Sequence, residues 1–491
     1  MTLSNWISAE WRLSIGRAAS LFLFVLFSAL LACAALNGKA HLDKRLESID
    51  RHQTDIARSM SGWLKDLEQK ESLGAEAEVS PRTGSAMDIR FSSHLPQRAL
   101  ADFSIGQSDI LPYVGTVALF DPDIRMFTRY EFDDPVSLML GAFDLSMAII
   151  VLLPLLLIVF CFDLLSADRD AQRLGLILSQ GVSIKSLFWH RLLLRSAAVV
   201  VVFMLIMLLA LLLNSGAASF YERSMAFMFW AAASLLYIAF WIAVIALVVS
   251  YNRRSEFNIM AMLGIWLAFV FIVPAGASTV LETVYPTPTR LAYLAEVRQM
   301  ENEARLQEAD IANRFIMDHP EMLVNEDTEF PAFLRAAFLV NSTVDRATRP
   351  IQDEFEAAAR QRQASVGIIR YLSPAIIIDG LFNDLAGTSS ARHQRYMQQV
   401  RDYKAEFAGQ VGASIVAGQP LTVAEFKAIS AFSFADEPLI HVLDRHVLPL
   451  LFLTLLVIVL VILINQRLAL FSVVGGNNRT GKDTATTRPQ A

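Results

Sequence analysis

Long, nearly uncharged stretches alternate along the chain with two long polar segments. Each stretch can cross the roughly 30 Å hydrocarbon core of a bilayer as a helix that rises about 1.5 Å per residue. The pattern therefore predicts an α-helical integral membrane protein with six transmembrane helices. The six stretches are 17–37, 142–165, 192–214, 226–250, 257–281 and 447–465.

The first polar segment, 38–141, changes character partway along. Apolar residues recur at helical spacing over 41–70, and Gly74 with the Ser/Pro/Gly-rich piece 80–85 ends that pattern. Prolines punctuate the remainder, which is typical of strands and loops. We expect a first outer domain of mixed α/β structure.

The second polar segment, 282–446, has mainly helical spacing. Helices are expected over 290–317, with Thr289 as N-cap, over 342–371 and over 391–411. Their charged faces are most simply solvated surfaces. The segment therefore predicts a second outer domain that is mainly α-helical.

The distribution of charge indicates an orientation. Apolar residues make up 54% of the chain, and the mean hydropathy is +0.43. Short loops rich in Lys and Arg stay in the cytoplasm, whereas long domains translocate largely regardless of charge. Lys and Arg occur in the short loops 163–195 and 251–257. The long segments contain more acids than bases: 17 Asp and Glu against 12 Lys and Arg in 38–141, and 22 against 16 in 284–446. We therefore expect both termini in the cytoplasm and both long segments in the periplasm.

This orientation divides the chain into consecutive parts. A cytoplasmic N-terminus and the first span are followed by a periplasmic domain, four spans, a second periplasmic domain, the last span and a disordered cytoplasmic tail. The parts are 1–37, 38–141, 142–281 with a loop at 163–191, 282–446, 447–465 and 466–491.

The spans contain few groups that could carry chemistry. Cys33 and Cys161 lie in apolar runs, which indicates neither a disulfide nor a metal site. Leu-Leu-Ala before Cys33 resembles a lipoprotein cleavage box, but the apolar run before it favours an uncleaved first span. Asp144 is an intramembrane carboxylate near the end of its span, where a capping or anchoring role is favoured over a functional one. Pro154 and Pro274 are expected to kink their helices.

The polar tail contains a false phosphate-binding motif. Gly476 to Lys482 copies most of a phosphate-binding loop, but Asp483 stands where the Mg²⁺-binding Ser or Thr belongs. No strand can be placed before it. We therefore expect no nucleotide binding here, and the chain shows no internal source of energy for moving a substrate.

The loop between spans two and three is the most informative segment. Residues 166–183, SADRDAQRLGLILSQGVS, combine alternating charge, helical spacing and a stop at Gly181. The pattern predicts a charged amphipathic helix, with Leu174, Ile177 and Leu178 as its apolar face. Such a helix could dock on a partner protein or lie on lipid headgroups, and the residues alone favour neither.

The same residues carry a family resemblance. FDLLSADRDAQRLGLILSQGVSIKSLFWHRLLL resembles the permease subunits of ABC type-2 exporters, where Glu-Arg-Glu follows span two and a helix with Leu-Leu-Ser-Gln-Pro-Val-Ser docks on the ATPase subunit. Here Asp-Arg-Asp and Gly181 replace Glu-Arg-Glu and Pro, which keeps the charges and the helix breaker. The resemblance implies that the ATPase contacts are Asp168, Arg169, Asp170, Gln172, Arg173, Leu174, Ile177, Leu178, Ser179 and Gln180.

Two further motifs resemble a subfamily with enlarged periplasmic domains. FSIGQSDILPY is similar to its Gly-Gln-x-Asp-x-x-Pro-Tyr signature, and YLSPAIIIDGLFNDLAGTSSARHQRYMQQV to its Ser-Pro-Ala and Leu-Ala-Gly-Thr motifs. The matching residues are Gly106, Gln107, Asp109, Pro112, Tyr113, Ser373, Pro374, Leu385, Gly387 and Thr388.

The resemblance implies a non-catalytic permease subunit of an ATP-driven exporter in the bacterial inner membrane. The expected partners are a cytoplasmic ATPase and a second permease subunit, identical or paralogous. No cofactor is expected in this chain, because ATP and Mg²⁺ would bind the ATPase, and no nucleic acid is expected. Two alternatives remain: a subunit that transmits force to periplasmic partners, and a membrane scaffold or sensor without an ATPase. The substrate is not readable from the sequence.

Overall fold

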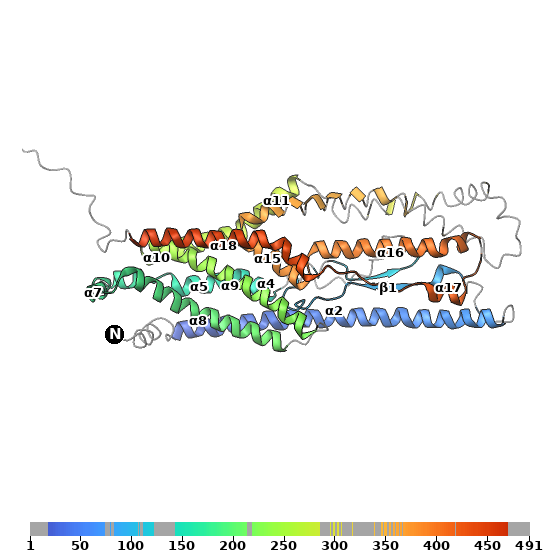
Figure 1. Cartoon of the computed structure of the whole chain (residues 1–491), viewed down its shortest axis with the longest axis horizontal. Helices are drawn as coiled ribbons and strands as arrows, with labels where there is room; N and C mark the ends of the chain where they lie inside the picture. The colour runs from blue at the N-terminus through green and yellow to red at the C-terminus, as the bar shows by residue number, and fades with distance from the viewer. Residues whose placement is uncertain are drawn as a thin grey trace, which may run out of the picture.

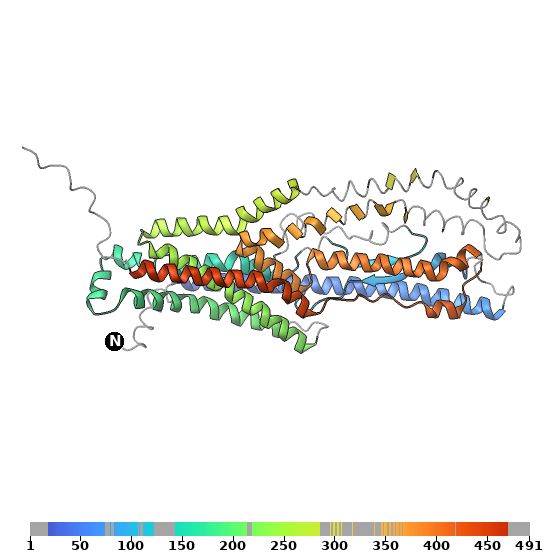
Figure 2. The ribbon, with the colours of Figure 1, turned by 45° about the horizontal axis from the view of Figure 1, so that its top comes forward.

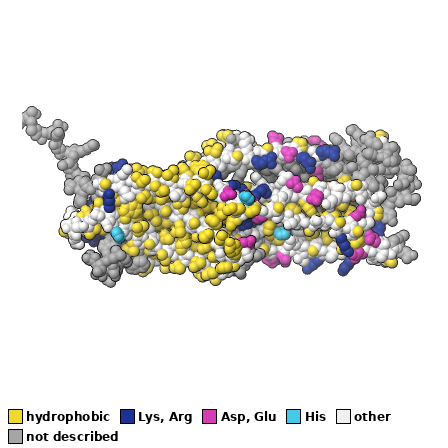
Figure 3. Space-filling model, in the orientation of Figure 1, with side chains coloured by type: hydrophobic (Ala, Val, Ile, Leu, Met, Phe, Trp, Pro, Cys, Tyr) yellow, Lys and Arg dark blue, Asp and Glu magenta, His cyan; other side chains and the backbone are white. Residues whose placement is uncertain are grey.

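The computed structural model describes residues 18–73, 83–106, 111–121, 143–213, 219–284, 367–417 and 419–469, with isolated positions at 79, 108 and between 295 and 365. The described residues form an elongated molecule (Figure 1), with apolar side chains over one half and charged side chains mainly over the other (Figure 3). The helix predicted over 290–317 is described only at isolated positions, all of them helical, and most of that predicted over 342–371 is described and helical. The Thr289 cap and the motif at 476–483 lie outside the described residues.

Six helices among the described residues are long and apolar enough to cross a membrane, as predicted. Each contains most or all of one predicted apolar stretch, and hydrophobic side chains form a broad band over this half of the molecule (Figure 3). The chain is therefore an α-helical, multi-pass membrane protein in architecture. The six are α2 (Ala18–Leu73), Leu145–Asp170, α8 (Ile184–Leu213), α9 (Phe220–Ser250), Ser255–Val284 and α18 (Leu439–Ala469).

Two of these spans contain a stretch of π-helix just before a proline. In the second span, η5 (Ala148–Leu152) links α4 (Leu145–Met147) to α5 (Leu153–Cys161); α6 (Ser166–Asp170) follows. In the fifth, η6 (Ala268–Ile272) links α10 (Ser255–Leu267) to α11 (Val273–Val284). The wider turn of a π-helix interrupts the regular ladder of hydrogen bonds.

Neighbouring side chains bond the carbonyls near both prolines. Pro154 has no N–H to donate to the Ile150 carbonyl four residues earlier, and the Tyr237 hydroxyl donates to that oxygen at 2.9 Å. In the fifth span, the Phe269 carbonyl lies five residues before Pro274 and accepts the Ser373 hydroxyl at 2.5 Å. Both interruptions are thus satisfied by groups from other helices, as membrane helices require.

The first helix continues without a break from the span into the polar module. It has 56 residues and is about 84 Å long at about 1.5 Å per residue. Beside it lie the antiparallel strands β1 (Phe91–His94) and β2 (Val114–Val117), whose register pairs Phe91 with Val117. The helix and strands agree with the mixed α/β character predicted for the first polar segment.

The described parts of the two polar segments share one hydrophobic core. Trp63 and Leu67 of α2 pack in one cluster with Tyr396 and Phe407 of α16 (Ser390–Ala417), and α17 (Val423–Ala428) covers its edge. The sequence divides these segments because four spans lie between them. In space their described residues form a single structure beyond one end of the spans (Figure 1), which we call the outer module for that position alone: residues 39–73, 83–106, 111–121, 390–417 and 419–438.

Candidate functional site

The loop 163–191 contains two short helices instead of the single helix predicted. After α6, the chain turns and resumes as α7 (Leu174–Ser179). Gln172 ends α6 with φ +57°, a left-handed conformation that is uncommon outside glycine. The Arg173 and Gln172 N–H groups then bond the Asp168 and Arg169 carbonyls at 2.8 and 2.9 Å, a pattern that closes helix ends.

The end of α7 is where the sequence places it. Gly181 has φ +81°, and its N–H donates to the Leu178 carbonyl at 3.1 Å. Glycine adopts this conformation without the steric penalty that a Cβ brings. The chain therefore leaves α7 sharply and enters α8 at Ile184.

Arg169 joins this loop to the turn between the fourth and fifth spans. Its guanidinium donates to the Asn252 carbonyl and side-chain oxygens at 2.6 and 2.9 Å and to the Arg253 carbonyl at 3.0 Å. It also pairs with Asp170 at 3.2 Å. Because a guanidinium presents donors in a fixed, planar arrangement, these bonds hold α6 in one orientation against that turn.

Two carboxylates join the loop to α8. Asp168 pairs with Arg191 at 2.5 Å and with Arg173 at 3.3 Å, and Asp163 pairs with Arg195 at 2.6 Å. The side chains of Arg191 and Arg195 are 9% and 10% exposed. The predicted charged contacts Asp168 and Arg169 are thus used mainly within the chain, where they fix the loop to its own spans.

The exposed surface of the loop differs from the predicted one. Leu174 is buried in the core of the spans, and Ile177 and Leu178 are partly buried against it. The most exposed large apolar side chain of the loop is Leu176, which is 68% exposed, and Val182 after α7 is 39% exposed. Around Leu176, exposed polar positions include Gln172, Arg173, Ser179 and Gln180, with Asp170 beside α6.

The Ser-Pro-Ala and Leu-Ala-Gly-Thr motifs mark the two ends of α15 (Pro374–Ala386). Ser373 caps its start by accepting the Ala375 N–H at 3.2 Å, and Pro374 occupies the first turn. Gly387, with φ +74°, and Thr388 close its other end. Leu385 is buried in the core of the spans. The sequence predicts a stop at Ser373-Pro374 but not the helix that begins there.

The Gly-Gln-x-Asp-x-x-Pro-Tyr segment packs on this helix end. A Cβ on Gly106 would lie 2.7 Å from Asn383 Oδ1 and 2.8 Å from Thr388 Oγ1, so two motifs far apart in sequence are in contact. Pro112 is buried, and the Arg45 guanidinium lies 4.7 Å from the Tyr113 ring centre. Gln107 and Asp109 lie outside the described residues.

Asp144 caps the second span from its outer end. Its carboxylate accepts the Met147 N–H and the Ile105 N–H, both at 2.7 Å. The first bond caps α4, and the second attaches the segment around Ile105 to the span. Its position agrees with a capping role.

A network of ion pairs connects α15, α16 and α18. We call this network the junction, and its members are Arg98, Asp384, Arg392, Arg395, Asp436, Glu437, Arg445 and His446. Asp436 accepts from Arg392 at 2.6 Å and from Arg98 at 2.9 Å. Glu437 pairs with Arg395 and Arg445, and Asp384 with His446. Sequence reasoning missed this network, because Arg98 lies 338 residues from Asp436 and Arg392 lies 44 residues from it. Only Asp436-Glu437-Pro438 forms a visible local run.

The junction shifts the ionisation of its carboxylates. Burial alone would raise the pKa of Asp436, but the hydrogen bonds and charges of Arg392 and Arg98 outweigh it and hold the pKa well below its usual range. Burial would likewise raise the pKa of Asp384, but the hydrogen bond with His446 helps to lower it below its usual value. Both carboxylates are therefore ionised at neutral pH and bind their cationic partners.

A second buried ion pair lies beside the junction. Arg223 of α9 donates to Asp102 at 2.8 Å and to the Ala99 carbonyl at 2.8 Å. The side chains are 6% and 0% exposed. On the opposite side, α2 contacts the Asp102 backbone so closely at Gly38 that any Cβ there would overlap the carbonyl oxygen. The fourth span, the loop 99–103 and the first helix therefore meet without free space.

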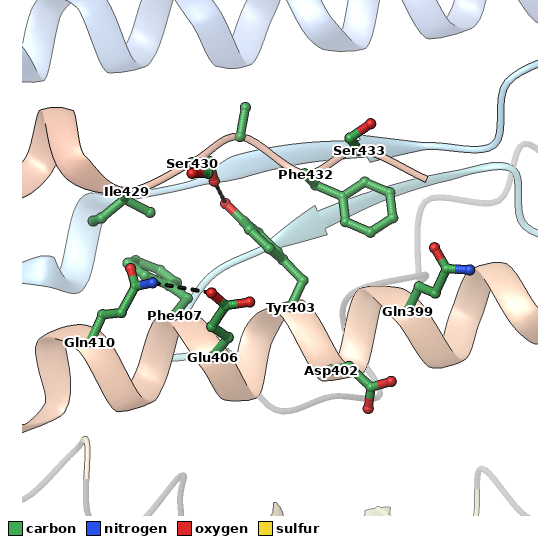
Figure 4. A pocket seen from close by; sticks show the side chains of 11 residues that line it. Gln399, Asp402, Tyr403, Glu406, Phe407, Gln410, Ile429, Ser430, Phe432 and Ser433 are labelled. Carbon is green, nitrogen blue, oxygen red and sulfur yellow. Dashed lines mark hydrogen bonds between the residues drawn. The ribbon is translucent and has the colours of Figure 1, made fainter. Parts of the chain in front are cut away.

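An extended segment, 429–438, runs along α16 from α17 to the last span. Tyr403 donates to the Ser430 carbonyl at 2.7 Å, and the Gln399 side chain bonds the Ala435 backbone in both directions. A hollow of about 360 Å³ lies between the two, where Tyr403 points toward Ser430 and Gln410 donates to Glu406 (Figure 4). The hydrogen bonds from Tyr403 and Gln399 therefore attach the segment to α16 beside this hollow.

The described residues contain no group of three or more His, Cys, Asp and Glu that could hold a metal ion. A family model for a domain of unknown function, DUF3526, matches residues 290–435. The matched part contains α15, α16 and α17, including the motifs at both ends of α15. No curated protein matches the chain, and no solved structure matches it.

Proposed function

We propose that the chain is the permease subunit of an ATP-driven exporter of the ABC type-2 class, located in a bacterial inner membrane. A separate cytoplasmic ATPase would dock on α7. The observation that carries this proposal is the exposed, partly apolar α7 surface, presented by a loop that ion pairs and hydrogen bonds fix to the spans.

The loop is connected so that a movement of α7 would reach several spans at once. It follows the second span directly and leads into α8, and Arg169 joins it to the turn between α9 and α10. Asp168 and Asp163 add ion pairs to α8. A rigid attachment of this kind passes a displacement on, whereas a flexible loop would absorb it.

The lipid-surface alternative accounts less well for the same contacts. A helix that lies on headgroups presents a long apolar face with basic residues beside it. Here Leu174 is turned into the protein and α7 has only six residues. The exposed Leu176 among polar side chains fits a small protein contact better than a membrane anchor.

The test purifies the tagged chain in lipid nanodiscs and asks whether an ABC-type ATPase co-purifies with it. We expect a stable complex whose ATPase rate differs from that of the ATPase alone. Arg169→Ala should leave the complex assembled but weaken this effect on rate, because it frees α6 from the 251–254 turn. Lys427→Ala, in an exposed ion pair of the outer module, is the control. Absence of any complex would instead favour a scaffold or sensor.

Force transmission is a second candidate, favoured by the length of α2. A single helix of 56 residues extends from a span to the far end of the outer module and shares the module's core with α16. It could carry a movement of the spans to periplasmic partners. Spin labels at Gly62 and Gly264, where nothing lies within 4 Å of an added Cβ, would measure it. An ATP-dependent change in their separation favours transmission, and an unchanged separation during transport favours export.

A further inference from the structure

A pocket of about 520 Å³ lies where the second and fifth spans meet α15. Its walls include Ile150 and Val151 of η5 and Val270 of η6, so both π-helical stretches border it. In Figures 1 and 2, α11 leans away from the other spans on this side. Irregular helical turns are frequent at functional sites, and here two of them face one space.

Two carboxylates line the pocket at its polar end. Asp379 of α15 is open to the pocket and accepts the Asn383 amide at 3.0 Å. Asp144 lines the same pocket, acts electrostatically on Asp379 and binds two backbone N–H groups. Among the described residues, no Lys, Arg or His forms an ion pair with either carboxylate, whereas every carboxylate of the junction has a cationic partner.

A buried hydroxyl also lines the pocket without a partner. Ser146 is 2% exposed, and its Oγ has no hydrogen-bond partner among the described residues. Buried polar atoms are nearly always bonded, so an orphan at a pocket wall indicates a missing ligand or solvent. This observation is independent of the acidic side chains.

Most of the remaining wall is apolar, apart from Ser104, Ser278 and Asn383. Ile150, Val270 and Leu281 are each at least nine-tenths buried and line the pocket, together with Pro274 and Ala375. A pocket with one polar end and apolar sides suits a ligand that has a polar head and a hydrocarbon tail. Its position beside two spans gives such a ligand access from the bilayer.

The electrostatics select the sign of the head. Although Asp379 is open to the pocket, protein surrounds it at longer range, and this burial, with the nearby Asp144 carboxylate, raises the pKa of Asp379 to about 7. Two acids without a counter-ion repel each other. A cation between them would relieve that repulsion and favour the ionised form of both.

We propose that this pocket binds an amphiphilic cation, with its ammonium head between Asp379 and Asp144 and its alkyl tail along Ile150, Val270 and Leu281. A bare metal ion is a poorer fit, because both Asp144 oxygens already accept N–H groups and the pocket is mostly apolar. Binding does not depend on an ATPase; that the ligand is exported rests on the function proposed above.

The test measures binding to the chain alone, in phosphatidylcholine nanodiscs without ATP or ATPase, by calorimetry. The probes are decyltrimethylammonium, tetramethylammonium, which lacks the tail, and decanol, which lacks the charge. We expect saturable binding of decyltrimethylammonium and at least tenfold weaker binding of the other two. Empty nanodiscs give the background for partition into lipid.

Two variants separate the head from the tail. Asp379→Asn keeps the shape but removes the charge, and should weaken binding of decyltrimethylammonium at least tenfold. Ala277→Phe should fill the pocket and abolish binding without touching either acid. Asp402→Asn is the matched control, because it removes an exposed carboxylate from α16, outside this pocket.

Three results would overturn the proposal. One is equal loss of binding in Asp379→Asn and Asp402→Asn, which would indicate only a general effect of charge. Another is equal binding of decanol and decyltrimethylammonium, which would indicate partition into lipid. The third is displacement of the probe by millimolar Mg²⁺, which would identify an inorganic cation site. Because no ATPase is present, none of these results bears on the coupling of the loop.

Discussion

The two ends of the spans use charged residues in opposite ways. At the loop 163–191, Asp163, Asp168 and Arg169 bind the chain's own spans and turns, and the surface of α7 presents the apolar Leu176 among polar side chains. At the junction, Arg98, Arg392 and Asp436 are enclosed between α15, α16 and α18 and contribute little to the surface. The first arrangement leaves a surface for a partner, whereas the second joins two parts of one molecule.

This contrast indicates what each end can do. A surface Leu held by a rigid loop can be covered by another protein without reorganising the chain. Buried ion pairs, in contrast, resist separation, because a charge left without its partner is strongly unfavourable inside a protein. The spans and the outer module should therefore move as one body at the junction, and motion should enter at the loop.

The largest effect should come from the buried pair beside the junction. Arg223→Met leaves the Asp102 carboxylate buried without its guanidinium and should lower the free energy of unfolding by about 3–5 kcal/mol. The control Lys427→Met breaks the exposed pair with Glu68 and should cost at most about 1 kcal/mol. Thermal unfolding in detergent compares them. Equal losses would mean that the enclosed pair is no stronger than a surface pair.

A smaller loss of stability is expected where α2 contacts the loop 99–103, and a second glycine in the same helix provides a close control. Gly38→Ala places a Cβ against the Asp102 carbonyl and should destabilise the protein by about 1–3 kcal/mol. Gly62→Ala, in the same helix with open space around it, should be neutral or slightly stabilising, because alanine favours helix. If Gly38→Ala is tolerated as well as Gly62→Ala, the close contact between helix and loop does not exist.

Acid should weaken the junction gradually. The pKa of Asp436 is lower in the folded chain than its ordinary value of 3.8, so its contribution is fully present above 3.8 and is lost as pH falls through the lower folded value. Asp436→Asn should therefore flatten the acid side of a plot of melting temperature against pH. Asp402→Asn, on an exposed face, should leave that side unchanged. If the melting temperature of Asp436→Asn still falls as steeply at low pH as that of the wild type, other groups cause the loss of stability in acid.

The spans could be predicted from sequence because the signal is local and repeated. Each apolar run is bounded by charge or proline, and all six predicted runs correspond to helices. The continuation of the first span into the helix over 41–70 was less visible, because a change of environment from apolar to polar looks like a boundary. The backbone stays helical through Gly38, a poor helix former, where the missing side chain lets α2 pack on the Asp102 backbone.

The sites were less predictable, for physical reasons. The loop divides into two helices because Gln172 adopts a conformation that sequence patterns assign to glycine. Which leucine faces outward then depends on that turn, so the periodic assignment of Leu174 could not anticipate the exposure of Leu176. The pairs Arg98–Asp436 and Arg223–Asp102 are long-range contacts, and a single sequence carries no local signal for them.

The central claim is that α7 is the surface where an ATPase delivers energy, and one binding measurement tests it most directly. The affinity of the co-purifying ABC-type ATPase for the nanodisc-embedded chain is compared between the wild type, Leu176→Asp and Leu73→Asp, a control at another exposed leucine, in the outer module. We expect Leu176→Asp to weaken binding at least tenfold, about 1.4 kcal/mol or more, and Leu73→Asp to leave it unchanged. Equal affinity of all three would contradict the account.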